Sequence, residues 1–205
     1  MTVISIVSQK GGSGKSTIAV NLAVAAMRDG LKVSLIDLDP QGTASSWIAV
    51  RGLDDIELVV CNGATLARTI ERQNRNGFLI LIDTPPHNSA LSAGAIHHSD
   101  LCIAPTRASA FDLAAVSATA ALIQSARCKT AFSIINAALP TSDIADTTEF
   151  LTNAGLPVLS VLSQRVAYQH AAAAGRGVLD SDQPPSARQA RNEFLTLWTT
   201  LTTKF

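Results

Sequence analysis

A glycine-rich segment near the start of the sequence has the composition of a phosphate-binding loop. It reads QKGGSGKST over residues 9–17, directly after a short apolar run and directly before a helical pattern. In that position, consecutive backbone N–H groups converge on phosphate oxygens, and the dipole of the following helix favours an anion. We expect Lys15 to reach the β- and γ-phosphates of a nucleotide and the Ser16 hydroxyl to bind Mg²⁺. The residues expected to cradle the phosphates are Gly11, Gly12, Ser13 and Gly14.

The loop departs from the strict G-x-x-x-x-G-K-[ST] pattern, because Gln9 stands where that pattern has its first glycine. The sequence has K-G-G-x-G-K-[ST] instead, with an additional lysine, Lys10. The alternative interpretation is a glycine-rich turn between a strand and a helix that binds nothing. We favour a phosphate site because the glycines, the lysine, the hydroxyl and the flanking elements occur together.

Carboxylates follow two further apolar runs. Asp83 closes the run FLILI at 78–82, and Asp37 and Asp39 come after the run ending at Ile36. We expect Asp83 to act on Mg²⁺ through a water, because Mg²⁺ takes few protein ligands and keeps waters. Alternation along the strand end puts Asp37 and Asp39 on the same side, where they can orient metal-bound and attacking waters. The alternatives are a helix cap or turn at Asp83 and an Asx turn before Pro40.

Short apolar runs alternate with helical patterns along the whole chain. Strands are predicted at 3–7, 33–36, 57–60, 78–82, 101–104, 131–135 and 158–161, and helices at 17–28, 66–73, 113–125, 147–154 and from about 187. Apolar strands without polar alternation indicate a parallel sheet buried on both faces, hence a doubly wound α/β fold. Residues 39–55 and 84–90 are predicted as loops at strand ends, where ligands bind in such sheets. We expect one domain over 1–205.

Composition narrows the function classes. The chain has 16 basic and 16 acidic residues, 47% hydrophobic residues and only 4% aromatic residues, so it is neither disordered nor a strongly basic polyanion binder. The three cysteines have no C-x-x-C spacing and are expected to pack as small apolar residues, which argues against an iron–sulfur carrier. No apolar stretch is long enough for a transmembrane helix, and the N-terminus lacks the basic region of a signal peptide. We therefore expect a cytoplasmic protein.

The motifs together resemble the ParA/MinD branch of P-loop ATPases, which has a deviant Walker A loop. Within that branch the chain is most similar to the short ParA-type partition ATPases. The resemblance covers nearly the whole chain. Its specific motifs are the loop at 10–17, the D-x-D-P-Q-G stretch at 37–42 and the Walker B strand at 78–83, which is followed by Thr84-Pro85-Pro86. It continues through the stretch 105–112, a strand ending in Asn136, the stretch 165–177 and a last amphipathic helix.

The resemblance implies a Mg²⁺-dependent ATPase that forms a nucleotide-sandwich homodimer in its ATP state. Lys10 would reach across the interface to the ATP of the partner, and Asp39 would position the attacking water, with Asp37 supporting the metal shell. Thr17 would lie against the α-phosphate, and the adenine near Asn136 and the loop after the strand at 158. Hydrolysis would be slow until a centromere-binding, ParB-type adaptor supplies a cation in trans.

The resemblance also implies non-specific binding of double-stranded DNA by the ATP dimer on the nucleoid. Residues 151–205 carry an excess of two positive charges, from Arg165, Arg176, Arg188, Arg191 and Lys204 against Asp180, Asp182 and Glu193. A few such cations suffice for weak phosphate contacts, although solvated surface arginines are the alternative. No helix-turn-helix precedes the glycine loop, so operator-specific repression is not expected.

Three other functions are compatible with the same ATP-binding motifs. The chain could position another cargo, such as a carboxysome or a chemoreceptor cluster. A MinD-like membrane switch would need a C-terminal amphipathic anchor, and the last helix carries Phe194, Leu195, Leu197, Trp198, Leu201 and Phe205. Its polar face holds threonines rather than many cations, so we expect it to pack on the sheet and expect no membrane partner. An ATP-dependent synthetase would leave Lys10 without a role.

Overall fold

Seven parallel strands form one sheet in the computed structural model, which describes residues 2–87, 89–182 and 184–204. The strand order is β3-β2-β4-β1-β5-β6-β7, so β2 to β4 lie on one side of β1 and β5 to β7 on the other. This confirms the predicted doubly wound, parallel sheet. The strands are β1 (Val3–Ile6), β2 (Val33–Asp37), β3 (Glu57–Val60), β4 (Leu79–Asp83), β5 (Leu101–Thr106), β6 (Ala131–Ala138) and β7 (Val158–Ser163).

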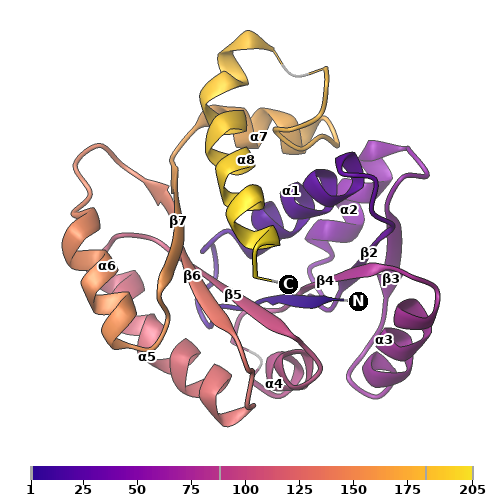
Figure 1. Ribbon diagram of the computed structural model, residues 1–205, viewed down its shortest axis with the longest axis horizontal. Coiled ribbons are helices and arrows are strands. Elements are labelled where there is room, and N and C mark those ends of the chain that lie inside the picture. Colours follow the sequence, from indigo (N-terminus) through magenta and orange to yellow (C-terminus); the bar gives the residue numbers. More distant parts are fainter. Residues whose placement is uncertain (1, 88, 183, 205) are drawn as a thin grey trace.

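Helices cover both faces of the sheet (Figure 1). One face packs against α1 (Lys15–Arg28), α2 (Thr43–Arg51), α7 (Val166–Ala173) and α8 (Arg188–Thr202). The other face packs against α3 (Leu66–Arg75), α4 (Ser89–His97), α5 (Ala110–Ser125) and α6 (Ile144–Asn153). All residues of β1, β2 and β4 are buried, as expected of central strands covered on both faces.

The prediction of a loop over 39–55 is wrong, because α2 occupies Thr43–Arg51 and β3 follows it closely. Only Ala44, Trp47 and Arg51 of α2 are buried, and this narrow buried side is hard to recognise in the sequence because it includes an arginine while apolar residues such as Val50 lie outside it. The predicted loop over 84–90 is too long, since α4 begins at Ser89, and α4 and α7 were not predicted. Two strands also extend one residue further than predicted, so Asp37 and Asp83 are their last residues.

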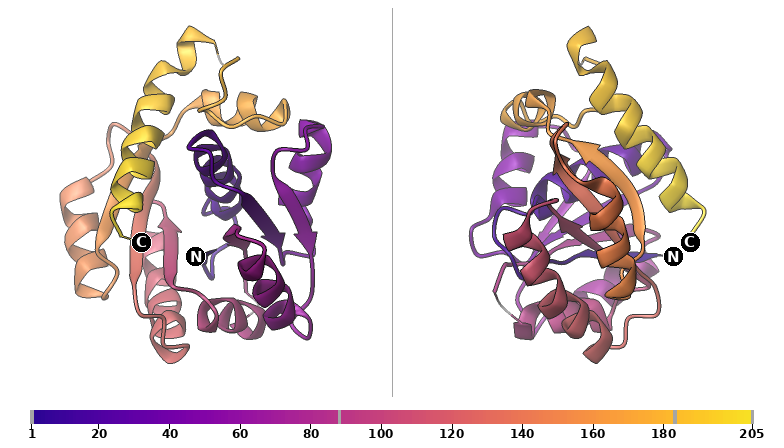
Figure 2. Two further views of the ribbon diagram at one scale, coloured as in Figure 1. Left: turned by 45° about the vertical axis from the view of Figure 1, so that its right-hand side comes forward. Right: turned by 90° about the vertical axis from the view of Figure 1, so that its left-hand side faces the viewer.

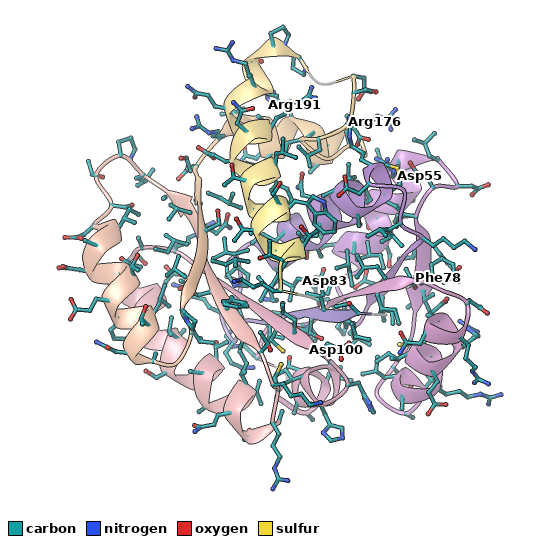
Figure 3. All side chains as sticks on the ribbon, in the orientation of Figure 1. Asp55, Phe78, Asp83, Asp100, Arg176 and Arg191 are labelled. Atoms are coloured by element: carbon teal, nitrogen blue, oxygen red, sulfur yellow. The ribbon has the colours of Figure 1, made fainter. Side chains whose placement is uncertain are left out.

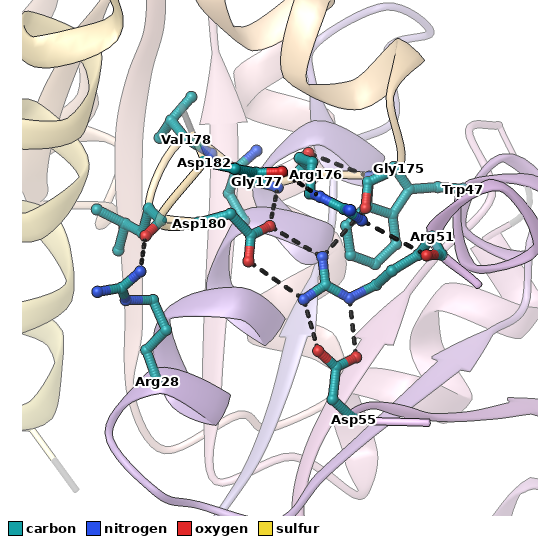
Figure 4. Close-up of polar contacts among 12 residues, drawn as sticks. Arg28, Trp47, Arg51, Asp55, Gly175, Arg176, Gly177, Val178, Asp180 and Asp182 are labelled. Carbon is teal, nitrogen blue, oxygen red and sulfur yellow. Dashed lines mark hydrogen bonds and ion pairs between the residues drawn. The ribbon is translucent and has the colours of Figure 1, made fainter. Parts of the chain in front are cut away.

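A buried arginine joins the end of α2 to the segment after α7 (Figure 4). The Arg51 side chain is fully buried and donates to the carboxylates of Asp55 and Asp180, at 2.7 and 2.9 Å, and to the Gly175 carbonyl at 3.1 Å. The Asp180 carboxylate also accepts from the Gly177 N–H at 2.8 Å. These hydrogen bonds outweigh the effect of burial and raise the pKa of Arg51 above its usual value. The network fixes α2, which begins beside the glycine loop, against the chain leaving α7.

The final helix packs on the sheet, as expected. Its residues Phe194, Leu197, Trp198 and Leu201 are buried in the same apolar cluster as α1, and the Trp198 indole donates to Asp29 at 2.6 Å. Figure 2 shows α8 running alongside β7 in both views. Leu195 points outward and is 52% exposed, whereas Phe205 lies outside the described residues. Within the described part of the chain, no helix has both the length and the apolar character needed to cross a bilayer.

Candidate nucleotide-binding site

The glycine loop joins the end of β1 to the start of α1 at the carboxyl edge of the sheet. Gly12 and Gly14 have φ angles of 71° and 101°, a region that side chains with a Cβ rarely adopt. A Cβ at Gly14 would lie 2.1 Å from Nδ2 of Asn136, so the loop has no room for a larger residue there. Ser13 is buried beneath the loop, whereas Gly11 and Gly12 are exposed. The backbone is therefore open to a ligand on its outer side, as a phosphate cradle requires.

Asn136 holds this loop from the neighbouring part of the sheet. Its Nδ2 donates to the Ser13 carbonyl at 2.8 Å, and the next residue, Ala137, has a φ of 52°. The sequence singled out Asn136 for the adenine pocket. In the structure Asn136 borders the cleft and also fixes the glycine loop, and its contact with adenine stays a prediction.

The two lysines of the loop have different surroundings. Lys15 is buried, its Nζ donates to the Lys10 carbonyl at 3.3 Å, and burial lowers its pKa while Asp83 and Asp39 oppose that effect. The Lys10 side chain is 34% exposed, and its Nζ lies 3.1 Å from the Asp112 carboxylate on α5 of the same chain. Lys15 thus faces the acidic groups of the site, whereas Lys10 is paired within its own subunit. The role of Lys10 across a dimer interface stays a prediction.

Asp83 at the end of β4 is a buried carboxylate (Figure 3). Its residue exposure is 0%, and among the described residues neither carboxylate oxygen accepts a hydrogen bond. Burial raises the pKa of Asp83 to about 7 and the nearby Asp37 carboxylate adds to the increase, while the Ser16 hydroxyl beside it and the charge of Lys15 oppose it. An unpartnered buried carboxylate is costly unless a cation or donor binds it. Asp83 beside Ser16 and Lys15 therefore fits a divalent cation held through few protein ligands.

Asp37 and Asp39 follow β2 and have distinct partners. Asp37 accepts hydrogen bonds from the Asp39 N–H at 3.1 Å, from the Ser45 N–H at 2.9 Å and from the Ser45 hydroxyl at 2.6 Å. It thus orients the turn that carries Asp39 and the first turn of α2. Asp39 accepts from the Gln41 N–H at 3.0 Å and remains partly exposed at the cleft. This geometry suits Asp37 as a supporting residue, and the roles of both carboxylates in metal and water binding stay predictions.

A cleft of about 480 Å³ runs from the glycine loop to the start of α7. The predicted residues along it are Gly11, Gly12, Gly14, Lys15, Ser16, Thr17, Asp39 and Asn136. Ser13, Asp37 and Asp83 lie behind this lining and are buried. The predicted residues that bind phosphates and the metal therefore come together at one edge of the sheet.

Two residues that line this cleft, Arg107 and Tyr168, were not predicted from the sequence as site residues, whereas the loop after the strand at 158 was expected near the adenine. Arg107 follows β5. The far wall of the cleft is formed by Ser163 at the end of β7, by Gln164 and Arg165 between β7 and α7, and by Tyr168 on α7. A cation directly after a strand, as at Arg107, is a signal that sequence analysis can use. Tyr168 gave no such signal, because α7 itself was not predicted.

The C-terminal cations are not equivalent. Arg165 pairs with Glu193 at 2.5 Å, and Arg176 pairs with Asp182 at 2.9 Å. Within the described residues, Arg188 and Arg191 on α8 take part in no ion pair, and Figure 3 shows Arg191 on α8. The predicted cationic region therefore has fewer free charges than its composition suggests.

A family model described as the CobQ/CobB/MinD/ParA nucleotide binding domain matches residues 4–178, which include the glycine loop and all three aspartates. The chain belongs to this ParA/MinD family. The match extends over most of the sheet and confirms the resemblance inferred from the motifs. The cleft at the glycine loop is therefore the candidate nucleotide-binding site of this domain.

Curated relatives of this ParA/MinD-family chain match over part of their length. "Maintenance of carboxysome distribution protein A" of Gloeobacter kilaueensis is 39% identical over 115 residues, which are 55% of this chain and 52% of the relative. "Chromosome-partitioning ATPase Soj" of Thermus thermophilus is 29% identical over 154 residues, 60% of this chain and 62% of the relative. The chain thus matches between half and two thirds of the length of these relatives.

Solved structures agree in fold. A McdA–ATP complex from Cyanothece superposes with a TM-score of 0.78 and 17% identity, covering 98% of this chain and 96% of that one. At this identity the likeness shows that the two chains share the fold.

Proposed function

We propose that this chain is a Mg²⁺-dependent ATPase of the ParA type that drives plasmid or chromosome partition. In this proposal the single domain over 1–205 binds ATP and forms a homodimer. The dimer binds double-stranded DNA without sequence preference on the nucleoid in the cytoplasm. A centromere-binding, ParB-type adaptor stimulates a slow hydrolysis of ATP to ADP and phosphate. The observation that carries the proposal is the presence of two lysines, Lys10 and Lys15, on one glycine loop that opens onto a cleft with Asp39.

The residues of the cleft suit phosphoryl transfer to water. Backbone N–H groups at Gly11, Gly12 and Gly14 and the Lys15 ammonium would hold the phosphates, and Thr17 would contact the α-phosphate. Asp39 would orient a water for attack on the γ-phosphorus, with ADP leaving. Ser16 and Asp83, supported by Asp37, would hold Mg²⁺, which when bound neutralises charge on the phosphate oxygens. Asn136 would contact the adenine, and Lys10 would contribute its charge to the ATP of the partner subunit.

Binding to random-sequence duplex DNA tests the proposal directly. We expect binding with Mg²⁺ and ATP, and not with ADP or without nucleotide, since the dimer doubles the number of cations from α8. The affinity should fall as salt rises from 50 to 200 mM, because phosphate contacts release counterions. Intact ATP binding without DNA binding under any condition would contradict the proposal. Vesicles of anionic lipid would then be the next surface to test.

A second candidate is positioning of a different cargo with the same ATP cycle. The observation that favours it is the 39% identity over 115 residues to a carboxysome distribution protein. ATP turnover on DNA should be measured with a ParB-type adaptor and with an adaptor from a carboxysome system. Stimulation by the ParB-type adaptor alone supports partition, whereas stimulation by the carboxysome adaptor alone supports the second candidate.

A further inference from the structure

One carboxylate of α8 holds the segment 163–165, which consists of the last residue of β7 and the two residues before α7. Glu193 accepts hydrogen bonds from the Ser163 N–H at 3.2 Å and from the Ser163 hydroxyl at 2.9 Å. It also accepts from Nε and Nη2 of Arg165, at 3.2 and 2.5 Å. Arg165 donates through Nη1 to the Gln189 side chain, one turn earlier on α8, at 2.6 Å. Both ends of this three-residue segment are therefore fixed to one helix.

The same segment forms the wall of the cleft opposite the glycine loop. Ser163, Gln164 and Arg165 line the cleft, and so does Tyr168, whose hydroxyl lies 3.4 Å from the Ala190 carbonyl of α8. Because the cleft runs from the glycine loop to this wall, a nucleotide with its phosphates on the loop would extend its ribose and base toward the wall. The sheet holds the start of this wall, because the Gln164 N–H donates to the Ala138 carbonyl of β6 at 2.9 Å. The Gln164 side chain is exposed and Arg165 is the cap residue before the eight-residue helix α7, so the side-chain contacts with α8 complete the support of the wall.

The contacts of Glu193 are stronger than those of an ordinary surface ion pair. The side chains of Arg165 and Glu193 are only 28% and 22% exposed. Burial opposes the charged form of Glu193, yet hydrogen bonds from Arg165 and Ser163 hold its pKa below the usual value. Two hydrogen bonds from the Arg165 guanidinium to the Glu193 carboxylate also restrict the orientation of both side chains more than a single hydrogen bond does.

We propose that Glu193 is a positioning residue for the base-binding end of the nucleotide cleft, acting through Ser163 and Arg165. This inference rests on the proposed function, because it takes the ligand to be ATP. It makes α8 part of the nucleotide site although α8 itself does not line the cleft. The same helix carries Arg188 and Arg191, so nucleotide binding and the cationic surface share one element.

The test compares ATP with inorganic tripolyphosphate, which lacks the ribose and base. In Glu193→Gln, which keeps the side-chain shape and removes the charge, we expect the Kd for ATP to rise about tenfold. The Kd for tripolyphosphate should stay within about twofold, because the glycine loop is untouched. Glu193→Asp keeps the charge and should recover part of the ATP affinity. Glu149→Gln, an exposed position on α6, is the matched control and should bind both ligands as the wild type does.

Amide hydrogen exchange over 163–169 supplies a second measurement, since the Ser163 N–H should lose protection in Glu193→Gln. An unchanged Kd for ATP, or an equal loss for ATP and tripolyphosphate, would overturn the inference. A wild-type chain that binds neither ligand would instead overturn the proposed function. The two failures are therefore distinguishable.

Discussion

At the scale of single residues, the ion pair between Lys10 and Asp112 provides a test of the proposed dimerisation that is separate from nucleotide binding. Lys10→Ala should leave ATP binding nearly intact and abolish ATP-dependent dimerisation, because Lys15 remains in the cleft. Asp112→Asn should favour the dimer by up to about fivefold, since such pairs contribute at most about 1 kcal/mol and Lys10 would be released. Sedimentation with and without ATP measures both effects. A Lys10→Ala dimer as stable as that of the wild type would exclude the predicted role.

The cysteines supply a residue-scale prediction with a pH dependence. A side-chain hydrogen bond with Cys102 lowers the pKa of Cys128 to about 7 despite burial, whereas burial raises the pKa of Cys61. Iodoacetamide attacks the thiolate, so Cys128 alkylation should increase as pH rises through 7 and level off near pH 8. Cys61, also half-buried, should react faster only above pH 9. Mass spectrometry of the alkylated peptides from pH 6 to 9.5 measures the extent of alkylation at each cysteine. The same pH profile for Cys128 and Cys61 would contradict the prediction.

At the scale of elements, the Arg51 network holds α2 against the chain that leaves α7. Arg51→Met would leave the carboxylates of Asp55 and Asp180 without their cation, and breaking a buried pair in this way costs about 3–5 kcal/mol. Urea unfolding should show this loss. Arg72→Met on the exposed side of α3 is the control and should change the free energy of unfolding by less than about 0.5 kcal/mol. Equal losses in the free energy of unfolding for the two substitutions would show that the Arg51 network does not stabilise the contact between α2 and the chain after α7.

The elements also show where sequence analysis succeeds and where it does not. The seven strands were predicted because their apolar runs are short, continuous and separated by longer helical patterns. The helix α2 was missed because its buried side is narrow and includes Arg51, which sequence alone assigns to the surface. The partners of Glu193 were missed for a related reason, since Ser163 and Glu193 are 30 residues apart and only the tertiary fold brings them together.

At the scale of the whole molecule, the sheet places every predicted site residue at one edge. The proposed ATPase cycle needs in addition a second copy of the chain and an adaptor. If Asp39 positions the attacking water, Asp39→Ala should bind ATP and dimerise yet fail to turn over. The dimer should then persist on DNA, which light scattering or sedimentation in the presence of ATP can follow. Hydrolysis at the wild-type rate would assign the water-positioning role to another residue.

The parallel topology has a practical consequence. Because all strands point the same way, the turns leading from a helix back into a strand lie at the edge away from the cleft. One of them contains Gly77, which is exposed, has a φ of 88° and has open space around it. A fluorescent reporter domain inserted after Gly77 would stand on the far side of the molecule from the bound nucleotide. Such an insertion would let the protein be followed in living cells with its catalytic edge unobstructed.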